Sequence, residues 1–344
     1  MADCHKLLLA YNSDDKGISL SQSKRDKLSN ARIIIENKIK NSDEYESSDY
    51  IIDFRPQGSF EMDTIINPIN SDDSYDIDHG VYFLSDIEPE IKPSTLKSWI
   101  FNVLENHTKN VSNKKNCIRV AYAVSSDLPT YHIDIPVYWQ KKEETPKLAS
   151  SLGWKESDPL QFVDWFNDMN KETKNQLIRI TRNFKWWARN LNGSMPSGII
   201  LTVLAAYNYH KDERDDISFY QTLNSIFCSL SEDFSCFRPT IPTDEDLFKG
   251  YSDTNKEYFL ERLKGFLKKS NEALETEDIE ESANLWNNIF GDKFSSITKE
   301  FIEGTKMNEN IKQNKISVLP SGVLSNNESN VKVSSTKFYG SNAI

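Results

Sequence analysis

Residues 75–84 read YDIDHGVYFL and residues 131–139 read YHIDIPVYW, and these two stretches decide the fold. Both are predicted to be β-strands. Because side chains two residues apart in a strand point to the same face, Asp76 and Asp78 project together. Asp134 lies inside the second apolar stretch, where an acid is costly unless it is paired or bound to a metal. If the two strands are neighbours, three carboxylates converge at one place.

Three converging carboxylates predict a two-metal site. Mg²⁺ prefers oxygen ligands and is usually held by one or two carboxylates together with substrate phosphates. In such a site one ion activates an attacking hydroxyl and the other stabilises the leaving group. We therefore expect Asp76, Asp78 and Asp134 to bind two Mg²⁺ ions, with Mn²⁺ as an alternative ion. A solvated strand face is the other interpretation of the first two acids. His79 and His132 are expected to pack on the opposite faces of their strands and not to be ligands.

The sequence around these strands predicts a mixed α/β region. Helices are expected at residues 24–41 and 97–106, and further strands at residues 50–54 and 117–124. Gly58 and Ser59 follow the first of these strands and precede a predicted helix start. There, glycine lets the backbone approach a phosphate and the serine adds a hydroxyl to the exposed N–H groups. An ordinary turn is the alternative for this pair.

The second half of the chain is expected to be helical. After a charged segment at residues 141–151, interpreted as a linker, the apolar spacing changes to the period of helices. Helices are expected at residues 176–191, 197–209, 218–230, 255–267 and 279–290. From about residue 305 polar residues dominate, which predicts a tail without stable structure. The expected parts are an α/β core over residues 1–145, a helical part over 146–304 and a flexible tail over 305–344.

Composition limits the classes of function. The chain has 344 residues with 41 Lys and Arg against 52 Asp and Glu, a net charge of −11. Such an acidic protein is a poor candidate for binding duplex DNA through a broad basic face. The N-terminus lacks the apolar core of a signal peptide, and no apolar run is long enough to span a membrane. We expect a cytoplasmic protein without a membrane partner. The four cysteines form no metal-binding pair and are expected to be reduced.

The motifs together resemble a known family. QGSF at residues 57–60, followed by the two quoted strands, is similar to nucleotidyltransferases of the DNA polymerase β type. More narrowly, the sequence resembles the CD-NTases, bacterial relatives of cGAS that make cyclic oligonucleotide signals in CBASS anti-phage defence. Within that family it resembles the DncV-type cyclic GMP-AMP synthases. SDP at residues 157–159, LIRITRNFKWWARN at 177–190 and MPSGIILTVLAA at 195–206 extend the resemblance over roughly residues 50–295.

The resemblance implies a bilobed α+β fold, in which a nucleotidyltransferase core is followed by a helical lobe and the site lies in the central cleft. It implies an enzyme that makes 3′,3′-cyclic GMP-AMP from ATP and GTP. A ribose hydroxyl would attack an α-phosphate at a two-metal site, pyrophosphate would leave, and a downstream effector would respond to the product. The alternatives are another cyclic di- or trinucleotide, a linear template-independent nucleotidyltransferase, and a catalytically dead nucleotide-binding module.

The resemblance also implies nucleotide contacts. The expected nucleotide-binding residues are Gln57, Gly58, Ser59, Arg119, Ser157, Lys185, Ser197 and Asp244. Of these, the first three would bind the triphosphate and Asp244 would read a guanine edge. Without the resemblance, Lys185 would belong to a solvated basic stripe with Arg182 and Arg189. Asp244 would then lie in a solvated acidic loop, and Arg119 would be a strand-edge charge.

Two further expectations concern aromatic residues and the tail. Trp165, Trp186 and Trp187 are expected in the core and not as a platform for stacked bases. Residues 334–344 fit the flexible end that ubiquitin-transfer-like enzymes conjugate to targets in related CBASS systems. A disordered end without function is the alternative for this tail.

Overall fold

The computed structural model of the chain describes residues 1–69, 73–123, 130–191 and 193–313, and three two-residue strands beyond them. The helices are α1 (His5–Tyr11), α2 (Gln22–Lys40), α3 (Asp43–Glu46), α4 (Gly58–Glu61), α5 (Pro93–Leu104), α6 (Pro159–Asn170), α7 (Gln176–Arg189), α8 (Gly198–Tyr207), α9 (Asp215–Glu232), α10 (Asp253–Glu275), α11 (Ile279–Phe290) and α12 (Asp292–Lys312). The strands are β1 (Ile51–Gln57), β2 (Tyr75–Ser85), β3 (Asn110–Asn113), β4 (Ile118–Tyr122), β5 (Tyr131–Ile135), β6 (Val137–Lys141), β7 (Lys147–Ser150), β8 (Gly153–Glu156), β9 (Ser317–Val318), β10 (Leu324–Ser325) and β11 (Val331–Lys332).

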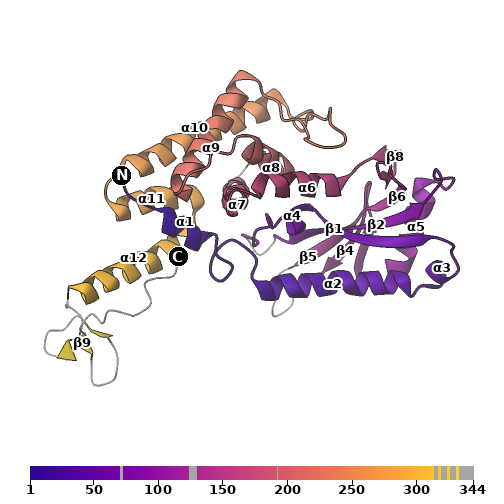
Figure 1. Cartoon of the computed structure of the whole chain (residues 1–344), viewed down its shortest axis with the longest axis horizontal. Helices are drawn as coiled ribbons and strands as arrows, with labels where there is room; N and C mark the ends of the chain where they lie inside the picture. Colours follow the sequence, from indigo (N-terminus) through magenta and orange to yellow (C-terminus); the bar gives the residue numbers. More distant parts are fainter. Residues whose placement is uncertain are drawn as a thin grey trace.

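Strand β2 is the centre of an eight-stranded mixed sheet (Figure 1). Strand β1 pairs with β2 antiparallel, and β5 and β6 both pair with it in parallel. The register is the same in β5, where Tyr131 lies opposite Tyr75, and in β6, where Val137 lies opposite Val81. The expected strand at residues 131–139 is therefore present, but it is interrupted at Pro136, which has no N–H to donate. Its carbonyl still accepts a hydrogen bond of 2.9 Å from the backbone N of Val81.

The two faces of β2 have different environments. Tyr75, Ile77, Val81 and Phe83 are buried in a core that includes residues of α2 and α5. The even-numbered residues of β2, which include Asp76 and Asp78, face the opposite side of the sheet, where α6 contacts β1 and α4 (Figure 1). This alternation puts both acids of β2 on the side of the helical half.

His79 lies on the α2 side, as expected. It is 1% exposed, and its Nε2 lies 2.9 Å from Oε1 of Glu36 on α2. Burial lowers the pKa of His79 to about 3, so the ring is neutral at physiological pH. The expectation that His79 is a packing residue is confirmed.

A second core holds the helical half together. It contains residues of α1 and of α6 to α12, among them large aromatic side chains that are fully buried: Phe166, Phe184, Phe219, Phe259, Trp286 and Phe290. Trp186 and Trp187 are each 4% exposed in this core, which confirms their expected role, and Trp165 packs against it while partly buried.

The segment after α4 connects the two cores. Phe60 and Ile65 belong to the core under the sheet, whereas Met62 and Ile66 belong to the helical core. Between them, Asp63 accepts hydrogen bonds from Arg25 of α2 and from Arg182 of α7. Residues 60–66 therefore fasten the sheet to the helices.

Two expectations about segments are wrong. The charged stretch at residues 141–151 is not a linker, because β7 and β8 form a hairpin that extends the sheet, with Leu148 and Ala149 buried. Helix α12 continues to Lys312, past the expected boundary near residue 305, and Lys306 in this extension forms an ion pair with Glu280 of α11. The tail at residues 334–344 lies outside the described residues.

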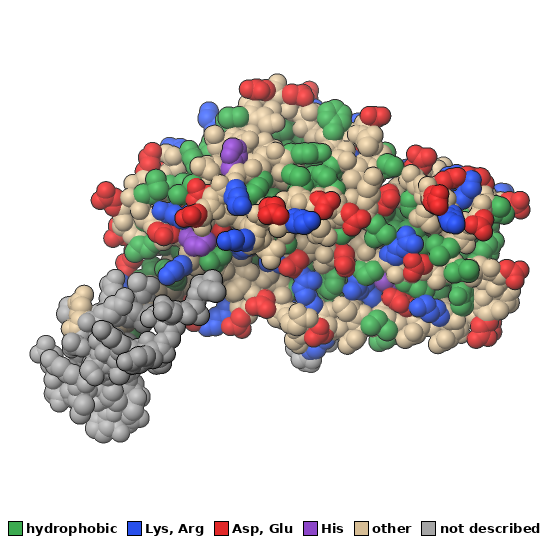
Figure 2. Space-filling view, in the orientation of Figure 1, with side chains coloured by type: hydrophobic (Ala, Val, Ile, Leu, Met, Phe, Trp, Pro, Cys, Tyr) green, Lys and Arg blue, Asp and Glu red, His purple; other side chains and the backbone are tan. Residues whose placement is uncertain are grey.

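The surface is mixed in charge. Figure 2 shows acidic and basic side chains interspersed over the visible face. Within the described ranges, no helix is both long enough and apolar enough to cross a membrane.

Candidate active site

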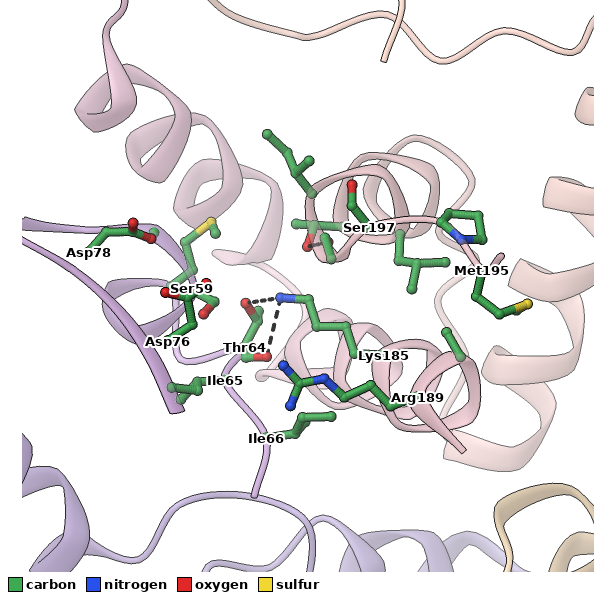
Figure 3. Close-up of a pocket in the computed structure, with 18 of the residues that line it drawn as sticks. Ser59, Thr64, Ile65, Ile66, Asp76, Asp78, Lys185, Arg189, Met195 and Ser197 are labelled. Atoms are coloured by element: carbon green, nitrogen blue, oxygen red, sulfur yellow. Dashed lines mark hydrogen bonds between the residues drawn. The ribbon is translucent and has the colours of Figure 1, made fainter. Parts of the chain in front are cut away.

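A cavity of about 720 Å³ lies between the sheet and the helical half. This volume is in the range of small-molecule sites, which is about 300–1,000 Å³. Its wall is formed by the end of β1 with α4, by the start of β2, by α7 and by the turn before α8 (Figure 3). The predicted site residues on this wall are Gln57, Gly58, Ser59, Asp76, Asp78, Lys185 and Ser197.

The register of the sheet brings the acids together. Asp76 lies opposite His132, and Asp78 lies opposite Asp134. One ligand atom from each of Asp76, His132 and Asp134 lies within 4.8 Å of the others. Nε2 of His132 is 2.9 Å from Oδ1 of Asp76.

The expectation that His132 faces away from the acids is therefore wrong. His132 and Asp134 are two residues apart in one strand, so they share a face by the same rule that pairs Asp76 with Asp78. The sequence contained this signal, and His132 is a site residue that the sequence reasoning missed.

Arg119 neutralises Asp134 in this structure. The two residues are partners in the antiparallel pair of β4 and β5, and the guanidinium donates two hydrogen bonds of 2.7 Å to the carboxylate. These bonds raise the pKa of Arg119, and Asp134 is 8% exposed. A paired arginine explains how a buried acid is tolerated before any ligand binds.

The two acids of β2 have different electrostatic environments. Burial, followed by the charges of Asp76 and Asp134, raises the pKa of Asp78 to about 7. Burial also pushes the pKa of Asp76 upward, but contacts with His132 and Arg119 lower it overall. Like charges that are close together oppose ionisation, and a cation between them relieves that cost. The site is therefore prepared for a positive ligand.

Gly58 makes the approach of α4 to the acids geometrically feasible. Its φ is +72°, a left-handed conformation that disfavours other residues. A Cβ atom at this position would lie 2.3 Å from Oδ2 of Asp78. The backbone of the turn can therefore lie directly against the carboxylate only because residue 58 is glycine.

Gln57 and Ser59 flank this glycine. The side chain of Gln57 is buried, accepting a hydrogen bond of 3.3 Å from the hydroxyl of Tyr82 and donating one of 3.4 Å to that of Tyr138. The carbonyl of Ser59 accepts hydrogen bonds from the backbone N–H groups of Thr64 (2.9 Å) and Ile65 (3.1 Å). These bonds hold the turn in place beneath the cavity.

Lys185 reaches the cavity from α7 (Figure 3). Its Nζ donates hydrogen bonds to Oγ1 of Thr64 (2.8 Å) and to the backbone carbonyl of Thr64 (3.3 Å). Burial, together with the charges of Arg189 and Arg182, lowers the pKa of Lys185 to about 7. The solvated-stripe interpretation is wrong for Lys185 and Arg182, which are buried, whereas Arg189 is exposed beside them on the cavity wall.

Four predicted residues do not line the cavity. Ser197 precedes α8 and lies on the wall, whereas Arg119, Asp134, Ser157 and Asp244 are not among the lining residues. Asp244 is exposed in its loop. Arg238, which precedes the same acidic turn, does line the cavity, and its guanidinium forms an ion pair of 2.6 Å with Glu245. Thr64, Arg189 and Arg238 are thus further lining residues that the sequence reasoning did not assign to the site.

Comparison with known families gives a match over the region that carries the acids. Residues 52–138 match the family model described as the nucleotidyltransferase domain of DncV-like cyclic GMP-AMP synthases. Curated relatives include a cyclic GMP-AMP synthase of Escherichia albertii, 29% identical over 194 residues, which are 53% of this chain and 42% of that protein. A cyclic GMP-AMP synthase of Escherichia coli is 24% identical over 312 residues, which are 74% of this chain and 71% of the relative. The chain thus spans about two fifths of the length of the first of these relatives.

Solved structures share the fold. The GTP-bound form of Vibrio cholerae DncV has a TM-score of 0.72 at 19% identity, covering 85% of this chain and 96% of that one. The same protein in complex with the linear intermediate pppA(3′,5′)pG has a TM-score of 0.70 at 18% identity, with coverage of 85% and 96%. The expected α+β fold with a helical C-terminal region is confirmed.

Proposed function

We propose that the chain is a CD-NTase of the DncV type, since residues 52–138 match the DncV-like nucleotidyltransferase model, and that it makes 3′,3′-cyclic GMP-AMP from ATP and GTP in CBASS defence. One observation carries this proposal. The acids of β2, the Gly58–Ser59 turn and the buried Lys185 converge at one cavity, and Asp134 of β5 lies opposite Asp78 in the sheet, although these residues come from different parts of the chain. This combination provides ligands for divalent cations and donors for a triphosphate.

The residues present fit a divalent cation. Oxygen atoms from Asp76, Asp78 and Asp134 would hold two Mg²⁺ ions, with Mn²⁺ as the alternative. When bound, such ions supply activation of the attacking ribose hydroxyl and stabilisation of the pyrophosphate leaving group. Arg119 holds the carboxylate of Asp134 in place in the free protein through its paired hydrogen bonds.

The remaining residues bind and orient the triphosphate. The backbone N–H groups at Gly58 and Ser59 and the Ser59 hydroxyl would contact phosphate oxygens, in the manner of other glycine-containing anion sites. Lys185 would exchange its hydrogen bonds with Thr64 for phosphate contacts, and the phosphate charge would favour the protonated amine. Ser197, on the opposite wall, would contact the second nucleotide.

Product formation requires two attacks. In the first, the 3′-hydroxyl of one nucleotide forms a bond to the α-phosphorus of the other, and pyrophosphate leaves. The linear product then re-orients, and the second attack closes the ring with loss of another pyrophosphate. Recognition of a linear intermediate by Vibrio cholerae DncV supports this order.

Selection of guanine is proposed for the loop that contains Asp244. An aspartate can accept hydrogen bonds from the N1–H and amino groups of guanine, which adenine does not offer in that arrangement. Because Asp244 is exposed here, this contact requires the loop to close over the bound base. Arg119 and Ser157 would then contact nucleotides at the edge of the closed site.

Conjugation of residues 334–344 by ubiquitin-transfer-like enzymes stays a proposal, as does a downstream effector. Conjugation would be tested by intact-mass analysis after co-expression with such enzymes. A chain without an adduct at its C-terminus would contradict it.

The proposed function is tested with purified protein, Mg²⁺ and all four NTPs. After phosphatase treatment, mass spectrometry should show one resistant species with the mass of cyclic GMP-AMP. The double variant Asp76→Ala/Asp78→Ala is the control and should give none. Another cyclic mass would correct the bases, whereas a ladder of linear products would show a template-independent polymerising enzyme instead. Nucleotide binding without any product would indicate a catalytically dead module.

A further inference from the structure

His132 has no part in the proposed reaction, yet its ring lies among the acids. Its backbone position is opposite Asp76 in the parallel pair of β2 and β5. Nε2 lies 2.9 Å from Oδ1 of Asp76 and belongs to the three-residue group that includes Asp134. The side chain of His132 is 13% exposed, so the ring is held in a defined place.

The other ring nitrogen has a partner of its own. Nδ1 lies 3.3 Å from Oγ of Ser74, which directly precedes β2 and lines the cavity. Histidines that bind metals usually donate the second ring N–H to a polar neighbour, which fixes the tautomer. In the tautomer in which Nδ1–H donates to Ser74, Nε2 presents its lone pair to the acids. Nε2 is buried, and although Oδ1 of Asp76 lies 2.9 Å away, the two atoms are not aligned as a hydrogen bond.

In that tautomer, a nitrogen lone pair and a carboxylate oxygen this close repel each other unless a cation lies between them. A metal ion fits the spacing, since two adjacent ligands on an octahedral ion with bonds of about 2.1 Å lie about 3 Å apart. We propose that Nε2 of His132 is a ligand of the ion held by Asp76 and Asp134, and that this nitrogen ligand makes the site prefer Mn²⁺ over Mg²⁺. Imidazole nitrogen favours first-row transition ions, whereas Mg²⁺ favours oxygen.

A nitrogen ligand would change which divalent ion the site selects. Carboxylates alone bind Mg²⁺ and Mn²⁺ through similar oxygen contacts, so they discriminate little between the two ions. A single imidazole changes this balance without altering the charge of the site. The inference concerns the metal site of the proposed nucleotidyltransferase and is tested without turnover.

The test measures metal binding to the full chain in the absence of nucleotide. Pulsed electron paramagnetic resonance of bound Mn²⁺ should show coupling to one nitrogen, and ¹⁵N-histidine labelling should change that coupling in the wild-type protein. His132→Gln should remove the coupling and raise the Kd for Mn²⁺ about tenfold or more, while the Kd for Mg²⁺ changes by less than about twofold. His210→Gln, which replaces an exposed histidine, is the matched control and should behave as the wild type.

Either of two results would overturn the inference. One is Mn²⁺ bound to the wild-type protein without nitrogen coupling, a measurement that does not depend on whether any variant folds. The other is a folded His132→Gln protein that binds Mn²⁺ as tightly as the wild type. The product assay with Mg²⁺ is run separately: a cyclic product without nitrogen coupling contradicts only the ligand, and coupling without any product contradicts only the proposed function.

Discussion

Gly58→Ala tests whether the approach of the turn to Asp78 positions the catalytic acids. The substitution has two separable costs. Left-handed backbone costs a residue with a Cβ about 1–2 kcal/mol. In addition, the new Cβ would lie 2.3 Å from Oδ2 of Asp78, where ordinary contact begins near 3.4 Å. One of the two atoms must therefore move by about 1 Å, and a displacement of this size at reacting groups costs about a hundredfold in rate.

Gly153→Ala is the matched control. Gly153 also has a positive φ, +114°, but a Cβ there would meet no atom within 4 Å. It should lose stability by a similar 1–2 kcal/mol, or a fall in Tm of about 2–8 °C, while retaining activity. We expect Gly58→Ala to lose about a hundredfold in kcat/KM for cyclic dinucleotide formation, as measured by product mass and pyrophosphate release. A Gly58→Ala enzyme within about threefold of the Gly153→Ala enzyme would refute this reasoning.

Three further predictions concern charge and packing. The pKa of Lys185 is about 7 in the folded chain and near 10.5 when exposed, so between these values the unfolded chain binds more protons, and the stability of the ligand-free protein should rise with pH. In urea unfolding, the free energy of unfolding of the wild type should rise more steeply with pH than that of Lys185→Met, by at most about 1.4 kcal/mol per pH unit. Equal slopes for the two proteins would contradict this prediction. Arg119→Ala leaves the acid at 134 without its paired donor and should cost about 1–3 kcal/mol, with Arg119→Lys recovering part of the loss in thermal unfolding; full stability of the alanine variant would be inconsistent with this account. Phe219→Ala removes a fully buried ring from the helical core and should cost about 3–5 kcal/mol in urea unfolding, against less than 0.5 kcal/mol or so for the exposed Phe237→Ala.

The sheet was predictable because one rule governs it. The period of two fixes which side chains share a face, and applied to Asp76, Asp78 and Asp134 it predicts their convergence. The same rule also places His132 on that face, because it is two residues from Asp134 and lies opposite Asp76 in the sheet. The break at Pro136 follows from the missing N–H, although the sequence does not show that both pieces keep the same partner strand.

Features that depend on packing between distant segments were not predictable. The burial of Lys185 follows from the contact of α7 with Thr64, which comes from a segment more than a hundred residues earlier in the chain. Whether Asp244 or Arg238 faces the cavity depends on the path of a loop, which composition does not determine. The extension of α12 beyond residue 305 brings Lys306 to Glu280 of α11, a contact between segments that the local sequence does not reveal.

The segment of residues 60–66, which alternates between the two cores, has a consequence for how the protein responds to its substrates. Its hydrogen bonds join the sheet to the helical half. The acids belong to the sheet, whereas Lys185, which donates to Thr64 of this segment, belongs to the helical half. A triphosphate that contacts both the Gly58–Ser59 turn and Lys185 would add a second connection between these two parts. Bound nucleotide should therefore make the two cores unfold more cooperatively.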